Sequence, residues 1–251
     1  MIIAIASQKG GVGKTSTAIS LSAGLVRQNK KVLLVDIDSQ ANASKVLLKN
    51  YSQLKRNDTI CRTILDRKPL PVYKTEIKGL EIIPSHILLS ETDMELTMAR
   101  DHREARLKDS LDLISANYDY VFIDCPPALS WLTINAFTAA DKILVVCSPG
   151  YFELDSLVQL SKTINEVKSL YNADVALLGF LFTMADPTIN SRESLKILRQ
   201  TYPDSTFKTV IPRNTDLRDA HFNRTTIFKF NPNAKSALAY QKLIKEILNN
   251  G

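Results

Sequence analysis

The chain has 251 residues, of which 45% are hydrophobic and 23% are charged, a composition typical of a globular protein. No apolar run approaches the roughly 18 residues that suggest a membrane span, and the amino terminus lacks the basic region and the cleavage site of a signal peptide. Cys61, Cys125 and Cys147 match no metal-binding spacing, and an odd number argues against a secreted disulfide framework. We therefore expect one domain over residues 1–251 in the cytoplasm, with reduced and mostly buried cysteines.

The net charge of +6 is concentrated in the last quarter of the chain. From Ala185 onward, eleven Lys and Arg residues accompany six Asp and Glu residues. A basic face there would attract a polyanion such as DNA, or an acidic membrane surface. A solvated surface explains the same excess equally well.

Short apolar runs alternate with segments of helical periodicity along the chain. Strands are predicted at Ile2–Ala6, Lys31–Asp36, Leu80–Pro84, Tyr120–Asp124, Lys142–Cys147, Ala176–Thr183 and Phe207–Val210. The helices predicted between them include Lys14–Gln28, Arg103–Asn117, Leu154–Tyr171 and Ser191–Gln200. Continuous apolar strands separated by helices indicate parallel βαβ units. The prediction is an α/β fold with a mostly parallel twisted sheet, helices on both faces, and ligands at the carboxyl ends of the strands.

The first strand runs directly into SQKGGVGKTS at residues 7–16. Glycines in this loop let several backbone N–H groups point at one site, to which the following helix adds the positive end of its dipole. This geometry holds phosphates, with Lys14 reaching the β- and γ-phosphates and the Thr15 hydroxyl binding Mg²⁺. The residues expected to bind the nucleotide here are Gly10, Gly11, Val12, Gly13, Lys14, Thr15 and Ser16.

Two later strands end in acidic residues. Asp36 and Asp38 lie at the end of VLLVDID, and Asp124 lies at the end of YVFID. One such acid can be a turn former or a helix cap, but three in a chain with this loop favour a metal site. We expect Thr15, Asp36 and Asp124 to form it, with Asp124 as a Walker B aspartate that holds magnesium through its water shell.

Four segments resemble the ParA/MinD family of deviant Walker-A ATPases, specifically its Soj-like ParA branch, which partitions chromosomes and plasmids. They are KGGVGKT at 9–15, VDIDSQANAS at 35–44, FIDCPPALSWLTINA at 122–136 and TVIPRNTDLRDA at 209–220. The resemblance runs nearly end to end. It implies a single-domain P-loop NTPase that hydrolyses ATP slowly with Mg²⁺ and forms an ATP-dependent homodimer. It also implies a nucleoid-associated cytoplasmic protein that binds double-stranded DNA non-specifically and is stimulated by a ParB-like partner.

The resemblance assigns catalytic roles to Lys9, Lys14 and Asp38. Lys9, the extra lysine of the loop, is expected to reach the nucleotide of the other subunit. Two facing ATP molecules bring negative charges into one interface, and a lysine supplied in trans offsets their repulsion, in the manner of an arginine finger. Asp38 is expected to position or activate the attacking water.

Further roles follow from the same resemblance. Pro212 and Arg213 match the segment that holds the adenine. Gln40 and Asn42 are expected in the first switch region, which responds to the γ-phosphate. Their alternative interpretation is as ordinary polar loop residues.

The chain departs from its family at the DNA-binding arginines. Where members of this branch commonly carry them, in segments resembling ADPTIN and IPRNTD, this chain has Thr188 and Asp216. Non-specific attraction to phosphate depends on local charge density more than on one residue, so a shifted patch is expected. The candidates are Arg192, Lys196, Arg199, Arg218, Arg224, Lys229 and Lys235.

Three alternative functions remain open. A MinD-like ATPase needs an amphipathic membrane-binding tail, whereas the stripe Tyr240, Leu243, Ile244, Ile247 and Leu248 is expected to be a face packed on the sheet. An iron–sulfur reductase of the related iron-protein type needs two suitably placed cysteines per subunit, and Cys125 alone does not provide them. A metabolic P-loop kinase or synthetase needs an acceptor pocket, for which no set of residues is recognisable.

Overall fold

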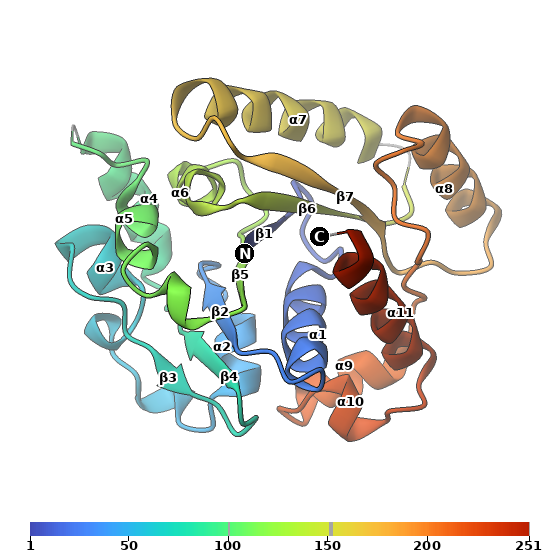
Figure 1. Cartoon of the computed structure of the whole chain (residues 1–251), viewed down its shortest axis with the longest axis horizontal. Helices are drawn as coiled ribbons and strands as arrows, with labels where there is room; N and C mark the ends of the chain where they lie inside the picture. The colour runs from blue at the N-terminus through green and yellow to red at the C-terminus, as the bar shows by residue number, and fades with distance from the viewer. Residues whose placement is uncertain (100, 151–152, 251) are drawn as a thin grey trace.

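The computed structural model describes residues 1–99, 101–150 and 153–250. At its centre lies one seven-stranded sheet in the order β3-β4-β2-β5-β1-β6-β7 (Figure 1). The strands are β1 (Ile2–Ala6), β2 (Val32–Asp36), β3 (Tyr73–Lys74), β4 (Leu80–Ile83), β5 (Tyr120–Asp124), β6 (Lys142–Cys147) and β7 (Ala176–Phe182). All neighbouring strands are parallel except β3, which runs antiparallel to β4. The α/β fold class is thus confirmed, with β3 as a short strand that the sequence did not predict.

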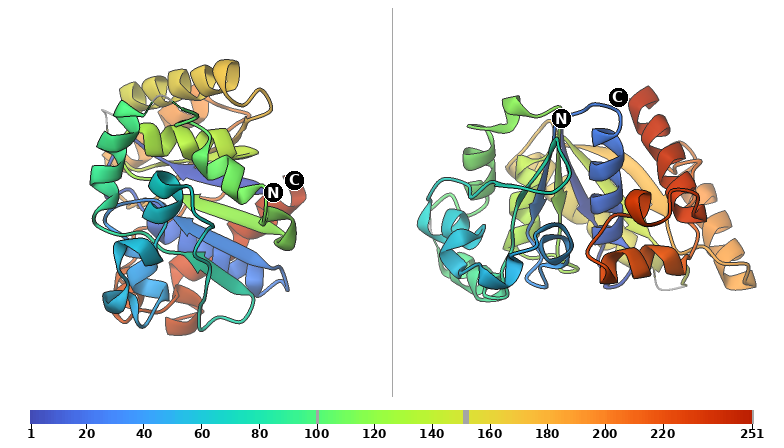
Figure 2. Two further views of the ribbon diagram at one scale, coloured as in Figure 1. Left: turned by 90° about the vertical axis from the view of Figure 1, so that its left-hand side faces the viewer. Right: turned by 90° about the horizontal axis from the view of Figure 1, so that it is seen from below.

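Helices cover both faces of the sheet (Figure 2). Their bounds are α1 (Lys14–Val26), α2 (Asn42–Leu47), α3 (Cys61–Asp66), α4 (Leu89–Met98), α5 (Arg106–Leu111), α6 (Trp131–Ala139), α7 (Glu153–Leu170), α8 (Ile189–Thr201), α9 (Thr215–Phe222), α10 (Ile227–Phe230) and α11 (Lys235–Asn250). Short 3₁₀ turns occupy Tyr51–Gln53, Arg56–Asp58 and Ser115–Asn117. In the described part of the chain, no helix combines the length and apolar character needed to cross a bilayer.

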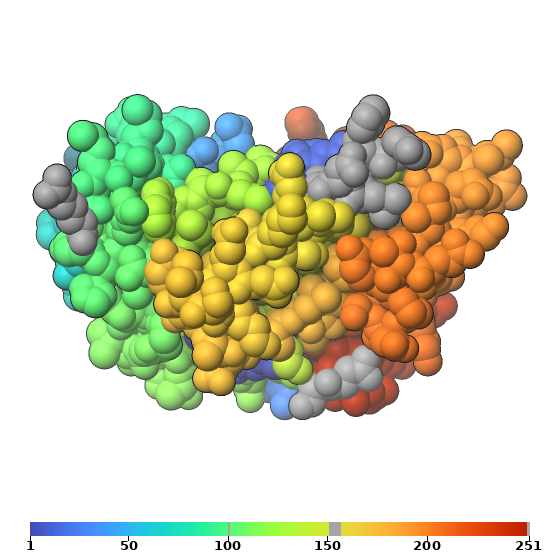
Figure 3. All heavy atoms as spheres, turned by 90° about the horizontal axis from the view of Figure 1, so that it is seen from above, coloured from blue at the N-terminus to red at the C-terminus, as the bar shows by residue number. Residues whose placement is uncertain are grey.

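Two apolar cores lie on opposite faces of this sheet. One contains residues from α3 to α8, and Figure 3 shows its outer surface, where α7 and α8 lie side by side. The other contains residues from α1, α2, α9, α10 and α11. In β1, Ala4 packs into the first core while Ile3 and Ile5 pack into the second. This burial on both faces explains why the strands read as continuous apolar runs.

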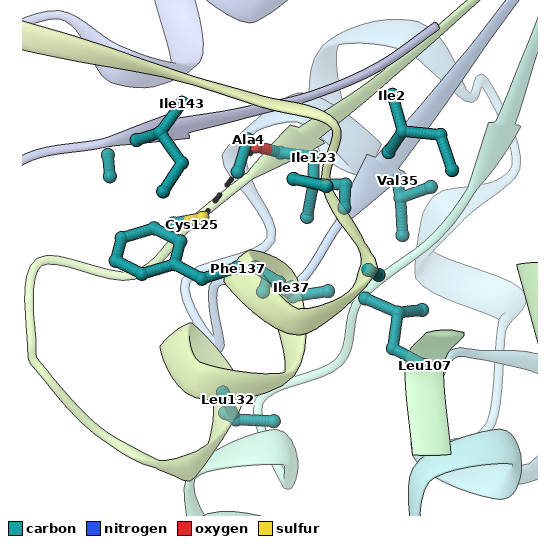
Figure 4. Packing of buried hydrophobic residues seen from close by; sticks show 14 of the residues in the cluster. Ile2, Ala4, Val35, Ile37, Leu107, Ile123, Cys125, Leu132, Phe137 and Ile143 are labelled. Atoms are coloured by element: carbon teal, nitrogen blue, oxygen red, sulfur yellow. Dashed lines mark hydrogen bonds between the residues drawn. The ribbon is translucent and has the colours of Figure 1, made fainter. Parts of the chain in front are cut away.

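The first core encloses the loop that follows β5 (Figure 4). Leu132 and Phe137 from α6 pack there with Ile123 and Ile143 from the sheet. Cys125 lies among them with its thiol directed at the carbonyl of Ile123, at 3.7 Å. None of the three cysteines forms a disulfide in the described chain, and all three are buried, as expected. The described chain therefore presents no pair of surface thiols of the kind that an iron–sulfur reductase requires.

Four residues of the carboxy-terminal stripe are buried and Leu248 is half-buried, but α11 packs chiefly against α1 rather than directly on the sheet. The Tyr240 hydroxyl lies 3.1 Å from the Thr17 hydroxyl of α1. The two helices approach closely at Gly24, where a Cβ atom would lie 2.1 Å from the Ile244 Cδ1. Because this apolar face is occupied within the molecule, α11 has the arrangement of a core helix.

The strand predicted at Phe207–Val210 is wrong. The Phe207 N–H donates to the Phe180 carbonyl at 3.0 Å, which begins a ladder with β7. The next two N–H groups, of Lys208 and Thr209, instead donate to the Glu246 carboxylate at 2.7 and 3.1 Å. The segment follows the edge of β7 with isolated bridges because α11 takes these donors.

The helix predicted at Arg103–Asn117 is also wrong in its extent. It is α-helical only over Arg106–Leu111, and a 3₁₀ turn follows at Ser115–Asn117. The Asn135 side chain on α6 accepts the Leu107 N–H at 3.1 Å and donates to the Arg103 carbonyl at 2.6 Å. These tertiary bonds hold the start of the segment outside the helix.

Candidate functional site

The loop between β1 and α1 has the backbone that binds an anion. Gly11 and Gly13 have φ values of 76° and 93°, in the left-handed region that glycine adopts without strain. Gly13 is the N-cap of α1 and has no side chain to cap the helix, so the first-turn N–H groups point toward the loop. A helix terminus of this kind attracts phosphate through its open donors and its dipole.

The loop is anchored to the neighbouring strand by a contact that the sequence did not reveal. The Thr183 hydroxyl, just beyond β7, lies 2.6 Å from the Val12 carbonyl and 2.9 Å from the Cys147 carbonyl. Val12 itself is buried. Thr183 therefore fixes the middle of the phosphate loop, although no local pattern distinguishes it from other polar residues at strand ends.

The two lysines of the loop occupy different environments. Lys14 is only 6% exposed and its ammonium donates to the Lys9 carbonyl at 3.1 Å. Burial lowers the pKa of Lys14, and the nearby Asp124 opposes that shift. The Lys9 side chain is exposed at the entrance of the loop. Lys14 thus lies within the site, and Lys9 lies where a second molecule can approach.

Asp124 has the properties expected of a metal-site carboxylate. It is fully buried, and neither carboxylate oxygen makes a hydrogen bond of good geometry with the described residues, although the Thr15 hydroxyl lies close enough to lower its pKa. Burial raises its pKa well above the usual value, the charge of Asp36 adds to this, and the Thr15 hydroxyl and Lys14 oppose it. A buried acceptor without a partner is rare, and a hydrated magnesium ion would satisfy it.

No group of three or more His, Cys, Asp or Glu side chains in the described chain is placed to hold a metal by itself. The residues present therefore fit an ion that is bound partly by the nucleotide. Magnesium is commonly held in this way, with one or two protein groups, several waters and substrate phosphates.

Asp36 is engaged differently from Asp124. One of its oxygens accepts the N–H and the hydroxyl of Ser44 at 2.9 and 2.7 Å, and the other accepts the Asp38 N–H at 3.2 Å. Burial raises its pKa to about 6, while the bonds from Ser44 oppose the shift. Ser44 also accepts the Ser85 N–H at 2.9 Å. Asp36 thus organises the loop after β2, and its role as a metal ligand stays a prediction.

Asp38 and the phosphate loop line one cavity of about 590 Å³, referred to below as the phosphate cavity. Asp38 is 8% exposed, and its carboxylate accepts the Gln40 N–H at 2.9 Å. Further residues that line this cavity are Gly10, Gly11, Gly13, Lys14, Thr15, Ser16, Gln40 and Asn42. The structure therefore brings the predicted water-positioning acid and the first switch residues to the phosphate loop.

A second cavity, of about 820 Å³, adjoins the phosphate cavity and contains Pro212 and Arg213. Gly13 and Met184 line both cavities. Asn214 lines the larger one, and its side-chain oxygen is buried without a partner in the described chain. The segment predicted to hold the adenine thus borders the phosphate loop, and Asn214 adds an open acceptor that the sequence analysis missed.

The seven candidate DNA-binding residues fall into three groups. Arg192, Lys196 and Arg199 lie on α8; Arg218 and Lys235 line the 820 Å³ cavity; and Arg224 and Lys229 line a separate cavity beside α10. The α8 group belongs to one face of the sheet, whereas α9, α10 and α11 pack into the core on the other. Arg199 nevertheless borders Glu246 of α11 in a cavity at the edge of β7, and which of the seven residues contact DNA stays a prediction.

The residues that replace the family arginines have structural roles. Thr188 is the N-cap of α8 and its hydroxyl accepts the Ser191 N–H at 3.2 Å. The Asp216 carboxylate accepts from the Asn231 side chain at 2.9 Å, which joins α9 to the segment after α10.

Comparison with known proteins identifies the family. A family described as an AAA domain, AAA_31, matches residues 1–177. The sporulation initiation inhibitor protein Soj of Bacillus subtilis is 38% identical and is aligned over 100% of this chain and 99% of its own length. The chromosome partitioning protein ParA of Myxococcus xanthus is 36% identical over 98% of this chain and 87% of its own length. The chain belongs to the Soj/ParA family of partitioning ATPases.

The fold of this Soj/ParA family member agrees with a solved structure. A crystal structure named as cobyrinic acid a,c-diamide synthase from Mycobacterium smegmatis, with a bound ATP analogue and magnesium, superposes with a TM-score of 0.84. It is 31% identical and covers 99% of this chain and 94% of that one. The resemblance inferred from the four segments and the P-loop fold class are both confirmed.

Proposed function

We propose that this Soj/ParA family member is an ATP- and Mg²⁺-dependent partitioning ATPase that works as a nucleotide-controlled switch. ATP joins two subunits, the dimer binds nucleoid DNA without sequence preference, and a ParB-like partner stimulates hydrolysis and release in the cytoplasm. The observation that carries the proposal is the phosphate cavity, where an anion-binding loop with the buried Lys14 meets Asp38, and where the charge of the buried Asp124 acts on Lys14. The family membership supports the same activity.

The residues divide the chemistry among them. The loop N–H groups and Lys14 bind the phosphates, while Thr15 and Asp124 hold Mg²⁺. When bound, magnesium neutralises charge that develops on the phosphate oxygens. Asp38 accepts a hydrogen bond from the attacking water and orients it toward the γ-phosphorus. The 820 Å³ cavity receives the nucleoside, where the Asn214 oxygen can accept from the adenine amino group.

Lys9 gives the proposed switch its dependence on a second subunit. Its side chain is exposed, next in sequence to Gly10, which lines the phosphate cavity, whereas the buried Lys14 lines that cavity itself. An ammonium group from the partner subunit would offset the repulsion between two bound triphosphates. Dimerisation then becomes favourable only with ATP present.

Sedimentation of an Asp38→Ala variant tests this assignment. With ATP and Mg²⁺ it is expected to accumulate as a dimer, because nucleotide binds but hydrolysis is slow. The Asp38→Ala, Lys9→Ala double variant is expected to stay monomeric while still binding nucleotide. A single variant that remains monomeric with saturating ATP, or a double variant that dimerises equally well, would contradict the proposed roles.

An ATPase assay separates a partitioning switch from a metabolic enzyme. Turnover is expected to be slow alone and to rise with duplex DNA and the cognate ParB-like protein. Lys14→Ala serves as the control and is expected to remove both basal and stimulated activity. Turnover that instead requires a small acceptor molecule would contradict partitioning and favour a kinase or synthetase.

A further inference from the structure

Four cations surround a cavity of about 250 Å³ on the α1 side of the sheet. They come from three separate segments: Arg27 caps the end of α1, Lys49 follows α2, and Arg224 and Lys229 lie before and within α10. These four residues and their cavity are called the basic cleft below. Its lining includes residues of α1, α2 and α10; the ribbons of α2 and α10 lie toward the lower edge of Figure 1. Two of its cations, Arg27 and Lys49, were not among the residues selected from the sequence.

Short-range contacts hold parts of the basic cleft in place. The Arg27 guanidinium lies 5.3 Å from the centre of the Phe228 ring and donates to the Phe228 carbonyl at 3.5 Å. The Arg224 guanidinium donates to the Lys49 carbonyl at 3.5 Å. These contacts tie α1 to α10 and the loop after α9 to the segment after α2. The four side chains remain exposed and therefore accessible to a ligand.

Glu76 is the one acid among the residues that line the basic cleft. It forms an ion pair with Lys49, and its pKa is lowered by the Lys49 hydrogen bond and also by the charge of Lys229. The cleft thus carries four positive charges and one negative charge at neutral pH. Such density, on residues that have no role in the phosphate cavity, indicates an anionic ligand.

We propose that the basic cleft binds the phosphodiester backbone of duplex DNA. This inference rests on the proposed function, which includes DNA binding but leaves its location open. Cations contributed by three segments suit an extended polyanion, whose neighbouring phosphates can each meet a different residue. The apolar lining residues Leu47 and Phe228 are buried, so the cleft offers charge rather than an apolar face that could enter a bilayer.

The α8 cations are less suited to the same ligand. Arg199 donates to the Lys208 carbonyl at 3.2 Å, and Glu193 lies on the same short helix as Arg192 and Lys196. Arg218 and Lys235 line the 820 Å³ cavity, where they are expected to contact the bound nucleotide instead. Of the three groups, the basic cleft is the one whose cations come from several segments and lie outside both cavities assigned to the nucleotide.

The test measures affinity for a random-sequence DNA duplex by fluorescence anisotropy, with an unhydrolysed ATP analogue and Mg²⁺, over a series of salt concentrations. The Arg27→Ala, Lys49→Ala variant is expected to bind at least tenfold more weakly near physiological salt. Its plot of log affinity against log salt should be shallower by about 0.9 for each lost phosphate contact. Glu76→Gln removes the negative charge of the cleft and is expected to bind DNA more tightly.

A matched control removes the same charge from the other face of the sheet. Lys162→Ala, Lys168→Ala alters two exposed lysines of α7 and is expected to bind DNA nearly as the unmodified chain does. Urea unfolding and analogue-dependent dimerisation, measured on every variant, establish that each is folded and competent. An equal loss in the control and in the cleft variant would overturn the inference, since net charge alone would then explain binding.

Two other outcomes separate this inference from the proposed function. If the unmodified chain binds no DNA at any salt concentration, the proposed function itself fails. If it binds DNA and the cleft variant binds equally well, the location is wrong and the function stands. Loss of binding to phosphatidylglycerol vesicles in the cleft variant, with DNA binding unchanged, would likewise overturn the inference in favour of a lipid surface.

Discussion

The carboxylate of Asp36 lies in a fully buried position at the end of β2, held by three hydrogen bonds. Removing a charge from water disfavours its ionised form, and the bonds from Ser44 offset only part of that cost. The folded protein therefore binds a proton at this residue more tightly than the unfolded chain does. Stability of the nucleotide-free protein should depend on pH for this reason.

The expected pH dependence has a definite sign. Asp36 titrates near 3.8 when unfolded and at about 6 when folded, so its contribution to stability is complete below 3.8 and is lost as the pH rises through 6. A difference of about two pH units corresponds to about 3 kcal/mol. Urea unfolding without nucleotide or Mg²⁺ should show that the free energy of unfolding falls less steeply over this range in Asp36→Asn than in the unmodified protein.

The exposed carboxyl of Asp109 provides the control for this measurement. In Asp109→Asn, the free energy of unfolding should fall with pH as steeply as it does in the unmodified protein. Asp124 shifts in the same direction as Asp36, so the Asp36→Asn slope should shrink without disappearing. If the free energy of unfolding depends on pH equally in Asp36→Asn and Asp109→Asn, ionisation of Asp36 has no free-energy cost in the folded state.

At the residue scale, sequence alone predicted the groups that a motif defines, because a phosphate loop places them by local geometry. Lys14, Thr15 and Asp38 line the expected cavity on this account. Thr183 and Asn214 were missed because their roles arise from contacts between distant segments. An isolated threonine or asparagine near a strand or helix end gives no signal of such a contact.

A hydrogen bond joins α4 to the start of α6. The Asp93 carboxylate of α4 accepts the Leu132 N–H in the first turn of α6 at 3.2 Å. Ser130, the N-cap of α6, makes no side-chain bond to the helix. Asp93, which belongs to α4, thus caps the amino terminus of α6. Its negative charge also suits the positive end of the α6 dipole.

Asp93→Ala should therefore destabilise the start of α6, at a cost of about 1 kcal/mol, which is typical for a lost cap. Hydrogen exchange should show faster exchange at the Leu132 amide, while amides in β5 keep their protection. Asp93→Asn retains a hydrogen-bond acceptor, so the Leu132 amide should keep most of its protection from exchange. If exchange at Leu132 is the same in all three proteins, the contact contributes nothing to the helix terminus.

Element prediction succeeded for six strands because continuous apolar runs identify strands that are buried on both faces. It failed at Phe207–Val210 because a distant carboxylate, Glu246, receives the amides that a strand would have paired. It missed β3 because Tyr73–Lys74 is too short to show any period. The first failure depends on a partner remote in sequence, and the second on the shortness of the strand.

At the scale of the whole molecule, the proposed site couples both cavities to the stability of the fold. A ligand that binds only the folded state stabilises it by about 2.7 kcal/mol at a hundredfold excess over Kd. For a chain of this size that corresponds to a rise in Tm of about 5–10 °C. An unhydrolysed ATP analogue with Mg²⁺ should produce such a rise in calorimetry.

Two lysine variants make this measurement specific. Lys14→Ala should lose most of the rise, because Lys14 contacts the bound phosphates within one subunit. Lys9→Ala should keep it at protein concentrations too low for dimerisation. An undiminished rise in Lys14→Ala would place the nucleotide elsewhere in the molecule.

The carboxylate of Glu246 also affects how molecules of this protein behave toward one another. β7 is the outermost strand on its side of the sheet, and an uncovered outer strand can template fibril growth by accepting a strand from a neighbouring molecule. With the amides of Lys208 and Thr209 held by this side chain, the segment beside β7 covers the edge without offering a regular row of donors. One glutamate on the last helix thus helps to keep a concentrated population of the protein from aggregating.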